Sequence, residues 1–503
     1  MSTWVRSLSP LLETTRKDIE EIARSCGLDF FDVIFEVVDY AQMNMLAAYG
    51  GFPQRYPHYT FGQEYYRLSK SYAYGLHRIY EMVINNDPCY AYLMESNQSV
   101  DDKLVMAHVY AHCDFFKNNM WFAHTNRKMM DEMANHASRI RYYVEQQGSD
   151  VVESFLDASR SIDSLIDIHS LHVVRREERR VTDDLLHVPE KEDDHVRRLT
   201  VPRGYLDSFV NPSVYIQEEK KRMERERNPE VAFPPVPEAD VVQFLLENAD
   251  LAPWQSDILS MLREEAYYFV PQAQTKIMNE GWATYWHSHI MTDRMVATSQ
   301  EIIDYADHHS GTVQLGRSLN PYRLGVQLFQ DIKERWDKGK FGPEYDRCED
   351  MTQLSHWDTH AGRGLEKIFE IRSTYNDVGF IEAFFTPEFC ERNNYFTYGY
   401  NEHYRQYKIE SRNFEEVKRK LLMSISNCGR PRVVLKDANY LNRNEMYLVH
   451  LHEGVGLKLA YAIETLKYVY VLWKRPVHVE TISGDKRVLV SFDGKESKVY
   501  TLK

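Results

Sequence analysis

Apolar and polar side chains alternate at helical spacing along most of the chain up to about residue 394. Apolar residues that recur three and four positions apart mark the buried face of an amphipathic helix. We therefore expect a mainly helical protein. The predicted helices cover residues 10–24, 28–45, about 101 onwards with a cap at Ser99, 126–147, 150–172, 241–269, 272–291, 293–308 and 320–336.

The periodicity changes after Tyr395. Alternation between apolar and polar positions predicts strands in YFTYGYNEHYRQYKIES, RPRVVLKDAN, VHVETI, RVLVSF and KVYTLK, and SGDK and DGKE are typical turns. A helical pattern returns in EGVGLKLAYAIETLKYVYVLW. The predicted fold class is mainly α, a multi-helix protein for which a zincin-like helical core is one candidate, with a small α/β C-terminal domain.

Residues 173–237 interrupt the helical pattern. The segment opens with VVRREERRVTDDLLHVPEKEDDHVRR, which is almost all charge, and ends in prolines. Such stretches bury little apolar surface, so we predict a charged insertion or linker. The predicted organisation is an N-terminal helical part at 1–172, this insertion at 173–237, a second helical part at 238–394 and the α/β domain at 395–503.

The chain carries 75 acidic and 61 basic side chains, a formal net charge of −14. This acidic excess argues against a general nucleic-acid binder. The six cysteines form no CxxC pair, so neither a disulfide framework nor a cysteine zinc site is indicated. The first residues have no long apolar core preceded by positive charge, and no later apolar run reaches 18 residues. We therefore expect neither a signal peptide nor a membrane span, and a cytoplasmic protein.

Two distant segments carry residues suited to chemistry. His108 and His112 lie four positions apart, so on one helix their side chains point the same way. Glu280 and His287, in NEGWATYWH, lie seven apart and share a face of a second predicted helix. Two histidines one turn apart and a carboxylate from another helix form a zinc-ligand set with one position open for water. We therefore predict a divalent metal, preferably zinc, on His108, His112 and Glu280.

The pattern departs from that of the gluzincin peptidases, which keep HExxH on the first helix. Here the tract is HVYAH, so Val109 stands where those enzymes keep the glutamate that deprotonates water. A substitute base has to come from elsewhere in the chain. The candidate catalytic residues are Glu95, Asp114, Glu132 and His287, with Glu280 itself as a further base.

His124 and His136 are additional candidate metal ligands, because they follow the first pair closely. With Glu132, which lies four positions before His136, they could hold a second metal or relay protons. The competing interpretation treats all these histidines as surface or buried structural residues. Paired ExxH ligands of the di-iron type are absent from the sequence.

Long motifs in this chain resemble the stage V sporulation protein R (SpoVR) family from near the N-terminus to the last hundred residues. The matching motifs are DPCYAYLMESN (87–97), VMAHVYAHCDFFKNN (105–119), HTNRKMMDEMANHASRIR (124–141), GYLDSFVNP (204–212), MLREEAYYFVPQAQTKIMNEGWATYWH (261–287), NPYRLG (320–325) and FTPEFC (385–390).

The resemblance implies a cytoplasmic bacterial protein associated, in spore formers, with assembly of the spore cortex. It also implies a serine protein kinase and a third protein encoded beside it as partners. It carries no established reaction, so the chemistry depends on the site. Our principal hypothesis is a metal-dependent hydrolase or amide-transfer enzyme that acts on a peptide-like or peptidoglycan-precursor substrate. The alternative is a non-catalytic regulatory or assembly factor that works with the kinase.

Overall fold

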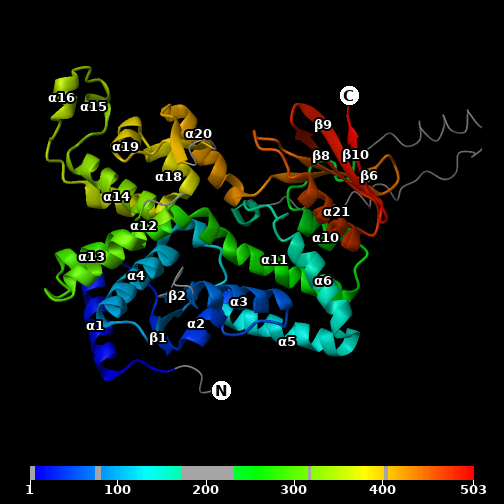
Figure 1. The fold of residues 1–503 in the computed structure, drawn as a ribbon, viewed down its shortest axis with the longest axis horizontal. Coiled ribbons are helices and arrows are strands. Elements are labelled where there is room, and N and C mark those ends of the chain that lie inside the picture. Colours follow the sequence, from blue (N-terminus) through cyan, green and yellow to red (C-terminus); the bar gives the residue numbers. More distant parts are fainter. Residues whose placement is uncertain (1–5, 74–80, 173–231, 315–318, 402–405, 503) are drawn as a thin grey trace, which may run out of the picture. The chain divides into compact units, whose positions relative to one another are not determined.

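The computed structural model describes residues 6–73, 81–172, 232–314, 319–401 and 406–502 (Figure 1). The chain forms two compact units, one from Met1–Arg160 with Ala252–Arg430 and the other from Ser161–Leu251 with Pro431–Lys503. The predicted fold class is confirmed, since the chain is mainly helical with a small sheet-containing C-terminal region. Most of the predicted insertion at 173–237 lies outside the described residues. Within the described ranges, no helix combines the length and the apolar character that crossing a membrane requires.

The first unit begins with α1 (Pro10–Ser25), where the Ser9 hydroxyl accepts a hydrogen bond from the Leu12 amide at 3.3 Å. The helix predicted at residues 28–45 was partly wrong. That stretch contains β1 (Val33–Val38) and then α2 (Tyr40–Ala48). The sequence VIFEVV is apolar at both strand and helix spacing, and β-branched residues favour a strand when a partner strand is available.

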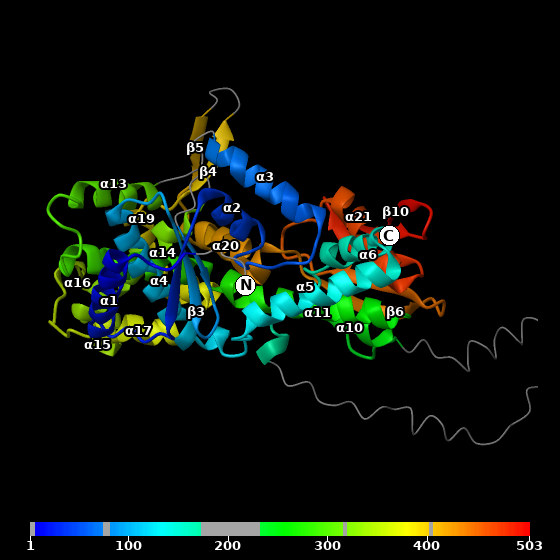
Figure 2. The ribbon, with the colours of Figure 1, turned by 90° about the horizontal axis from the view of Figure 1, so that it is seen from below.

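The partner strand is β3 (Cys89–Met94), which pairs in parallel with β1 and antiparallel with β2 (Glu81–Ile84). The resulting sheet, in the order β1-β3-β2, lies against α4 (Ser99–Asn118), as Figure 2 shows. The sequence analysis missed this sheet. The cap of α4 is Gln98, one residue earlier than predicted, and its amide donates to the Asp101 carboxylate at 3.2 Å.

Almost every side chain of α4 is buried, so it is the central helix of this unit. On one side it contacts α1 and the sheet, and on another it contacts α12 (Lys276–Ser288). α12 in turn packs closely against α14 (Pro321–Asp337), which begins at the predicted Asn320–Pro321. The three helices run beside one another in Figure 1 and enclose a core that contains the fully buried Trp282, Trp286 and Phe329.

A buried carboxylate fixes the start of α12. Asp377, in the first turn of α18 (Asp377–Phe384), accepts the amides of Ile277 and Met278 at 2.8 and 2.9 Å. These amides belong to the first turn of α12, where backbone donors have no partner within the helix. Asp377 therefore caps α12 from a distant part of the chain.

The other elements of the first unit complete its helical layers. They are α3 (Tyr59–Ala73), η1 (Met120–Phe122), α5 (Met129–Gln147), α6 (Ser149–Ser161), α11 (Pro253–Gln274), the π-helical turn η4 (His289–Asp293), α13 (Ile302–Thr312), α15 (Pro343–Asp346), α16 (Met351–Ser355), α17 (Gly364–Thr374), α19 (Pro387–Arg392), β4 (Thr397–Asn401), β5 (Gln406–Ser411), α20 (Phe414–Ile425) and η5 (Ser426–Gly429).

The second unit contains a five-stranded sheet in the order β10-β9-β8-β7-β6. Its strands are antiparallel except for β7 and β8, which are parallel and joined through α21. α21 packs on β8 and β9, as a crossover helix should. The elements are η2 (Ser170–His172), α10 (Val241–Asn248), β6 (Val433–Tyr440), β7 (Glu445–His450), α21 (Leu459–Trp473), β8 (Val477–Ser483), β9 (Lys486–Phe492) and β10 (Ser497–Thr501).

Candidate metal centre

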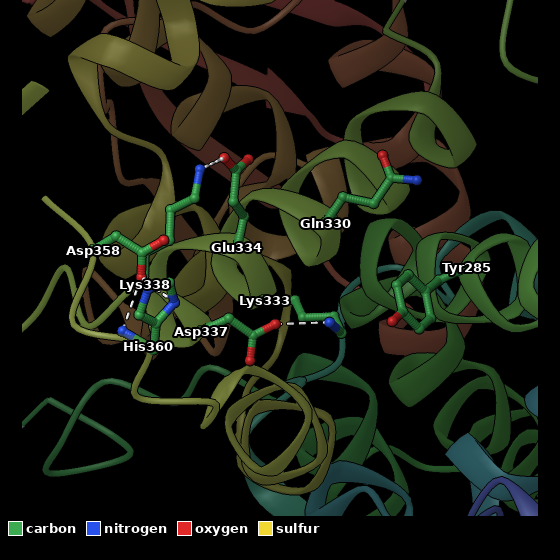
Figure 3. Close-up of a pocket in the computed structure, with 8 residues that line it drawn as sticks. All are labelled: Tyr285, Gln330, Lys333, Glu334, Asp337, Lys338, Asp358 and His360. Atoms are coloured by element: carbon green, nitrogen blue, oxygen red, sulfur yellow. Dashed lines mark hydrogen bonds and ion pairs between the residues drawn. The ribbon is translucent and has the colours of Figure 1, made fainter. Parts of the chain in front are cut away.

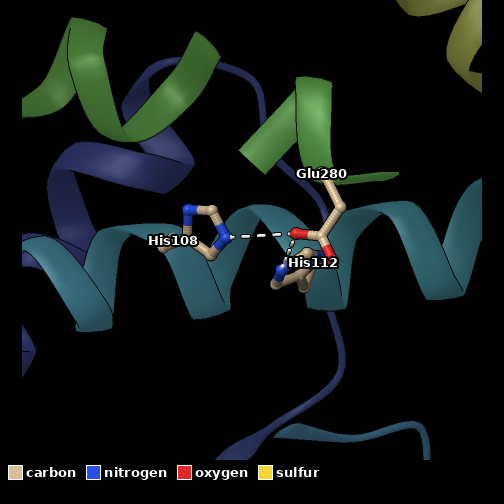
Figure 4. Close-up of side chains that lie close together, drawn as sticks. All are labelled: His108, His112 and Glu280. Atoms are coloured by element: carbon tan, nitrogen blue, oxygen red, sulfur yellow. Dashed lines mark ion pairs between the residues drawn. The ribbon is translucent and has the colours of Figure 1, made fainter. Parts of the chain in front are cut away.

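Helices α4 and α12 bring together the two histidines and the glutamate singled out in the sequence. The Nε2 atoms of His108 and His112 lie 3.7 and 3.6 Å from Oε2 of Glu280. Figure 4 shows both imidazoles projecting from α4 toward the same carboxylate. Among the described residues, these three form the group of histidine, cysteine and acidic side chains whose ligand atoms lie close enough to hold one metal ion.

The spacing of these atoms suits a small tetrahedral ion. Zinc bonds of about 2.0–2.1 Å to nitrogen and oxygen place neighbouring tetrahedral ligands roughly 3.3 Å apart. The two distances to Glu280 exceed this value by a few tenths of an ångström. All three ligand atoms lie within 4.8 Å of one another, so side-chain rotations would bring them to bonding distance. Three protein ligands leave a fourth position open.

The second nitrogen of each histidine is held by a residue of α12. Nδ1 of His108 lies 2.8 Å from Nδ1 of His287, and Nδ1 of His112 lies 2.9 Å from the side-chain oxygen of Asn279. Histidines that bind metals usually donate this second N–H to a protein acceptor, which fixes the tautomer and the ring orientation. One helix thus supplies the carboxylate ligand and supports both imidazoles.

Burial keeps the imidazoles of His108 and His287 neutral. His108 and His112 are each 4% exposed, and His287 is 1% exposed. Burial, reinforced by the neighbouring imidazole of His112, holds the pKa of His108 well below its usual value. The pKa of His287 is lowered for the same reasons, by burial first and then by His108 and His309. A neutral imidazole is the form that binds a metal.

The hydrogen bonds around the centre leave two acceptors, Nε2 of His112 and Oε2 of Glu280, facing each other. Because the Asn279 oxygen accepts from Nδ1 of His112, the Nε2 atom of that ring carries a lone pair. Oε2 of Glu280 is buried and has no hydrogen-bond partner among the described residues. A buried acceptor without a donor costs free energy, and a cation would compensate it. The donor set therefore fits a divalent metal.

Val109 occupies the position at which HExxH enzymes carry the glutamate that deprotonates water, so this position supplies no base. The Val109 side chain is fully buried in the main core. Glu95 and Glu132, two of the candidate bases, do not join the cluster. Glu95 lies on the surface and pairs with Arg6 at 2.5 Å, and Glu132 accepts a hydrogen bond from Asn135 on α5.

Asp114 is buried, but its carboxylate contacts structural partners. It accepts the indole N–H of Trp282 at 2.9 Å and the Asp29 amide at 2.8 Å, and it lies 3.4 Å from the guanidinium of Arg372. Burial raises its pKa to about 6 despite the nearby arginine. These contacts hold α4, α12 and α17 together, so the structure places Asp114 in the helix packing and not among the ligands.

His124 and His136, the two further candidate ligands, also lie apart from the cluster. His124 is exposed just before α5. His136 is buried on α5, where Nδ1 contacts Glu265 of α11 at 3.1 Å. Glu265 also pairs with the buried Arg55 at 2.6 Å. Glu265 thus holds Nδ1 of His136 in the helix packing, and the structure has one candidate centre among the described residues.

The sequence analysis missed two residues that contribute to the centre. Asn279 directly precedes Glu280, and this position next to a predicted ligand is the sequence signal that could have identified it. His309 lies on α13, and its Nδ1 is 3.2 Å from Nε2 of His287. Its sequence context, DHHSG, gave no indication of which helix it would meet.

A separate cavity of about 400 Å³ is lined by Tyr285 of α12, by residues of α14, and by Lys338, Asp358 and His360 (Figure 3). Its charged side chains are already paired with each other, Lys333 with Asp337 and Lys338 with Glu334, at 2.7 and 2.6 Å. Tyr285 follows Glu280 by five positions and so points away from the ligand face. The cavity therefore offers little uncompensated charge and is distinct from the candidate metal centre.

Comparisons with known proteins agree with this arrangement of motifs. The model of the family described as SpoVR like protein matches residues 7–430, which include every residue of the candidate centre. A relative described as "Uncharacterized protein YcgB", from Escherichia coli (strain K12), is 28% identical over 505 residues, covering 94% of this chain and 92% of its own. No solved structure matches the chain. The family model covers most of the sequence, and the chain belongs to the SpoVR family.

Proposed function

We propose that this chain is a zinc-dependent hydrolase, with the metal on His108, His112 and Glu280. The observation that carries the proposal is the convergence of two imidazole nitrogens on a buried carboxylate oxygen that has no hydrogen-bond partner among the described residues. Two imidazoles and one carboxylate give the ligand set of a catalytic zinc site with an open position. Zinc bound in such a site polarises a carbonyl group and lowers the pKa of water toward about 7.

The chain's own residues would orient the ligands and accept a proton. His287 and Asn279 hold the His108 and His112 rings through Nδ1. Of the bases considered, Glu280 is the one in the cluster. We assign it two roles, with Oε2 as ligand and the second carboxylate oxygen as proton acceptor.

An amide bond in a peptide-like substrate is the target that we propose, with peptidoglycan precursors as the leading class. The family's association with sporulation supports this class, since the spore cortex is a peptidoglycan layer. A family link does not specify a reaction, so the assignment depends on the site and its test.

Metal analysis of the purified full-length protein tests the first step. We expect about one zinc ion per chain in the wild type after zinc loading and dialysis. His108→Ala and Glu280→Gln should lose it, and His289→Ala is the matched control, because His289 bonds Asp293 on the protein surface. A wild-type protein that retains no stoichiometric metal overturns the proposal.

A product assay tests the second step. Peptides and peptidoglycan stem peptides are incubated with the zinc-loaded protein, and mass spectrometry detects newly formed amines. We expect products with the wild type and none with Glu280→Gln. Metal binding without product formation would instead favour the regulatory or assembly role, in which the centre is structural and a partner such as a kinase is the functional target.

A further inference from the structure

Helix α13 places a third histidine at the outer end of the His108–His287 contact. Nδ1 of His309 lies 3.2 Å from Nε2 of His287, whose Nδ1 lies 2.8 Å from Nδ1 of His108. The three imidazoles form a hydrogen-bonded chain from the buried centre to the partly exposed His309. His309 is not a member of the ligand group of His108, His112 and Glu280.

The protons along this chain have two consistent arrangements, because each contact needs one N–H and one lone pair. In the first, His108 donates through Nδ1 to His287, and His287 donates through Nε2 to Nδ1 of His309. In the second, every proton is reversed, and Nε2 of His108 carries a hydrogen toward Glu280. A metal on His108 requires the first arrangement, because the metal binds the lone pair of Nε2.

We propose that His309 is a positioning residue for the metal centre. Its Nδ1 accepts the Nε2 proton of His287, which leaves Nδ1 of His287 free to accept from His108 and turns the bare Nε2 of His108 toward the metal. The effect of His309 on metal affinity rests on the proposed function. Its effect on the tautomer of His108 can be measured in the metal-free protein.

The two ligand histidines differ in what they require. His112 is oriented by the side-chain carbonyl of Asn279, which is an acceptor in any state. His108 is oriented by an imidazole, which is an acceptor at Nδ1 when its proton is on Nε2. A third residue must therefore select the tautomer of His287, and His309 contacts the Nε2 atom of that ring.

Helix α4 also anchors the helix that carries His309. Near the start of α4, the carboxylate of Asp101 lies 2.6 Å from His308, and Lys103 pairs with Glu301 at 2.8 Å. Asp101 is buried, and the Lys103–Glu301 pair is mostly shielded from solvent. The helix that carries the ligand His108 thus holds α13 in register with it. Burial also lowers the pKa of His309, which keeps its Nδ1 available as an acceptor near neutral pH.

Two substitutions of His309 separate positioning from bulk packing. His309→Leu removes the acceptor, whereas His309→Asn places a side-chain oxygen near the position of Nδ1. The control is His289→Leu, which removes an imidazole that takes no part in the chain. We expect His309→Leu to weaken zinc binding by about 10-fold to 100-fold in chelator competition, His309→Asn to restore most of that loss, and the control to bind as the wild type does.

Nitrogen-15 spectra of histidine-labelled, metal-free protein give the second readout. We expect His108 to carry its proton on Nδ1 in the wild type and in His309→Asn, and to shift toward the Nε2-protonated form in His309→Leu. If His309→Leu unfolds, Lys103→Met, which loosens the hold on α13, should move both readouts in the same direction by a smaller amount.

The outcomes distinguish this inference from the proposed function. Unchanged affinity and tautomer in both His309→Leu and Lys103→Met overturn the positioning role and leave the metal proposal standing. A wild type that binds no zinc overturns the proposed function, and the tautomer measurement still decides the role of His309. A loss of affinity that His309→Asn does not restore would assign His309 to packing alone and also overturn the inference.

Discussion

Gly281 of α12 and Gly325 of α14 lie backbone against backbone. A Cβ atom on either residue would overlap main-chain atoms of the opposite helix. Neither glycine has an unusual backbone conformation, so the close approach of the two helices is what requires them. This contact sets the distance between α12 and α14, and therefore how α12 faces α4. Gly281 directly follows Glu280, so the contact lies beside the candidate ligand.

Replacing either glycine should destabilise the fold and disturb the centre. We expect Gly281→Ala to reduce the free energy of unfolding by about 3 kcal/mol, since the added methyl group meets backbone that cannot rotate away. Urea unfolding measures this change. Gly62→Ala, on α3 with open space around it, is the control and should be neutral or stabilising by roughly 0.5–1 kcal/mol.

The buried cap of α12 should make stability depend on pH. Burial raises the pKa of Asp377 to about 7, and this effect outweighs the two amide hydrogen bonds, which lower the pKa. An acid whose pKa is higher in the folded state binds more protons when folded, so its contribution is complete below about pH 4 and is lost as the pH rises toward 7. We expect a loss on the order of 4 kcal/mol between pH 4 and pH 7.

The variant Asp377→Asn tests that assignment. It keeps one acceptor for the α12 amides and removes the titration, so urea unfolding between pH 4 and pH 7 should show a flatter profile than the wild type. A profile with the wild-type slope would show that another group is responsible.

Asp114 should act through packing and not through chemistry. Asp114→Asn removes the charge that faces Arg372, and a buried guanidinium without its partner costs about 3–5 kcal/mol. Zinc stoichiometry of the folded fraction should not change. Asp29→Asn is the surface control, because its pair with Lys117 is exposed and should contribute less than about 1 kcal/mol. A stable Asp114→Asn protein that has lost its activity would contradict this prediction.

Asn279 should tune metal affinity through His112. We expect Asn279→Leu to weaken zinc binding by about 10-fold to 100-fold, because Nδ1 of His112 loses its acceptor. Asn279→Asp retains an acceptor and should bind at least as tightly as the wild type. Competition with a chromogenic chelator measures both, and equal affinities for the leucine and aspartate variants would exclude this role.

Metal removal should lower stability by mass action, since the ligands come from two helices that are adjacent only in the folded state. With free zinc at about 100 times its dissociation constant, binding adds about 2.7 kcal/mol. The chelator EDTA should therefore lower the melting temperature of the wild type and leave that of His108→Ala unchanged. An equal effect on both proteins would mean that chelation acts elsewhere.

The sequence by itself determined the features that depend on local geometry. Helical spacing placed His108 with His112 on one face, and Glu280 with His287 on another, because side-chain direction within a helix follows from residue separation alone. It also predicted the start of α14 at Asn320–Pro321. The long motifs were enough to identify the family.

The tertiary structure decided which faces meet. Residues 33–38 are apolar at either spacing, and they form a strand because β3 supplies the hydrogen-bond partner that a strand needs. Whether a histidine joins the centre likewise depended on which helix lies opposite. His136 faces a glutamate of α11, whereas His309, which no pattern distinguished, reaches His287 because α4 holds α13 beside it. Such contacts join residues far apart in the chain, and no local spacing encodes them.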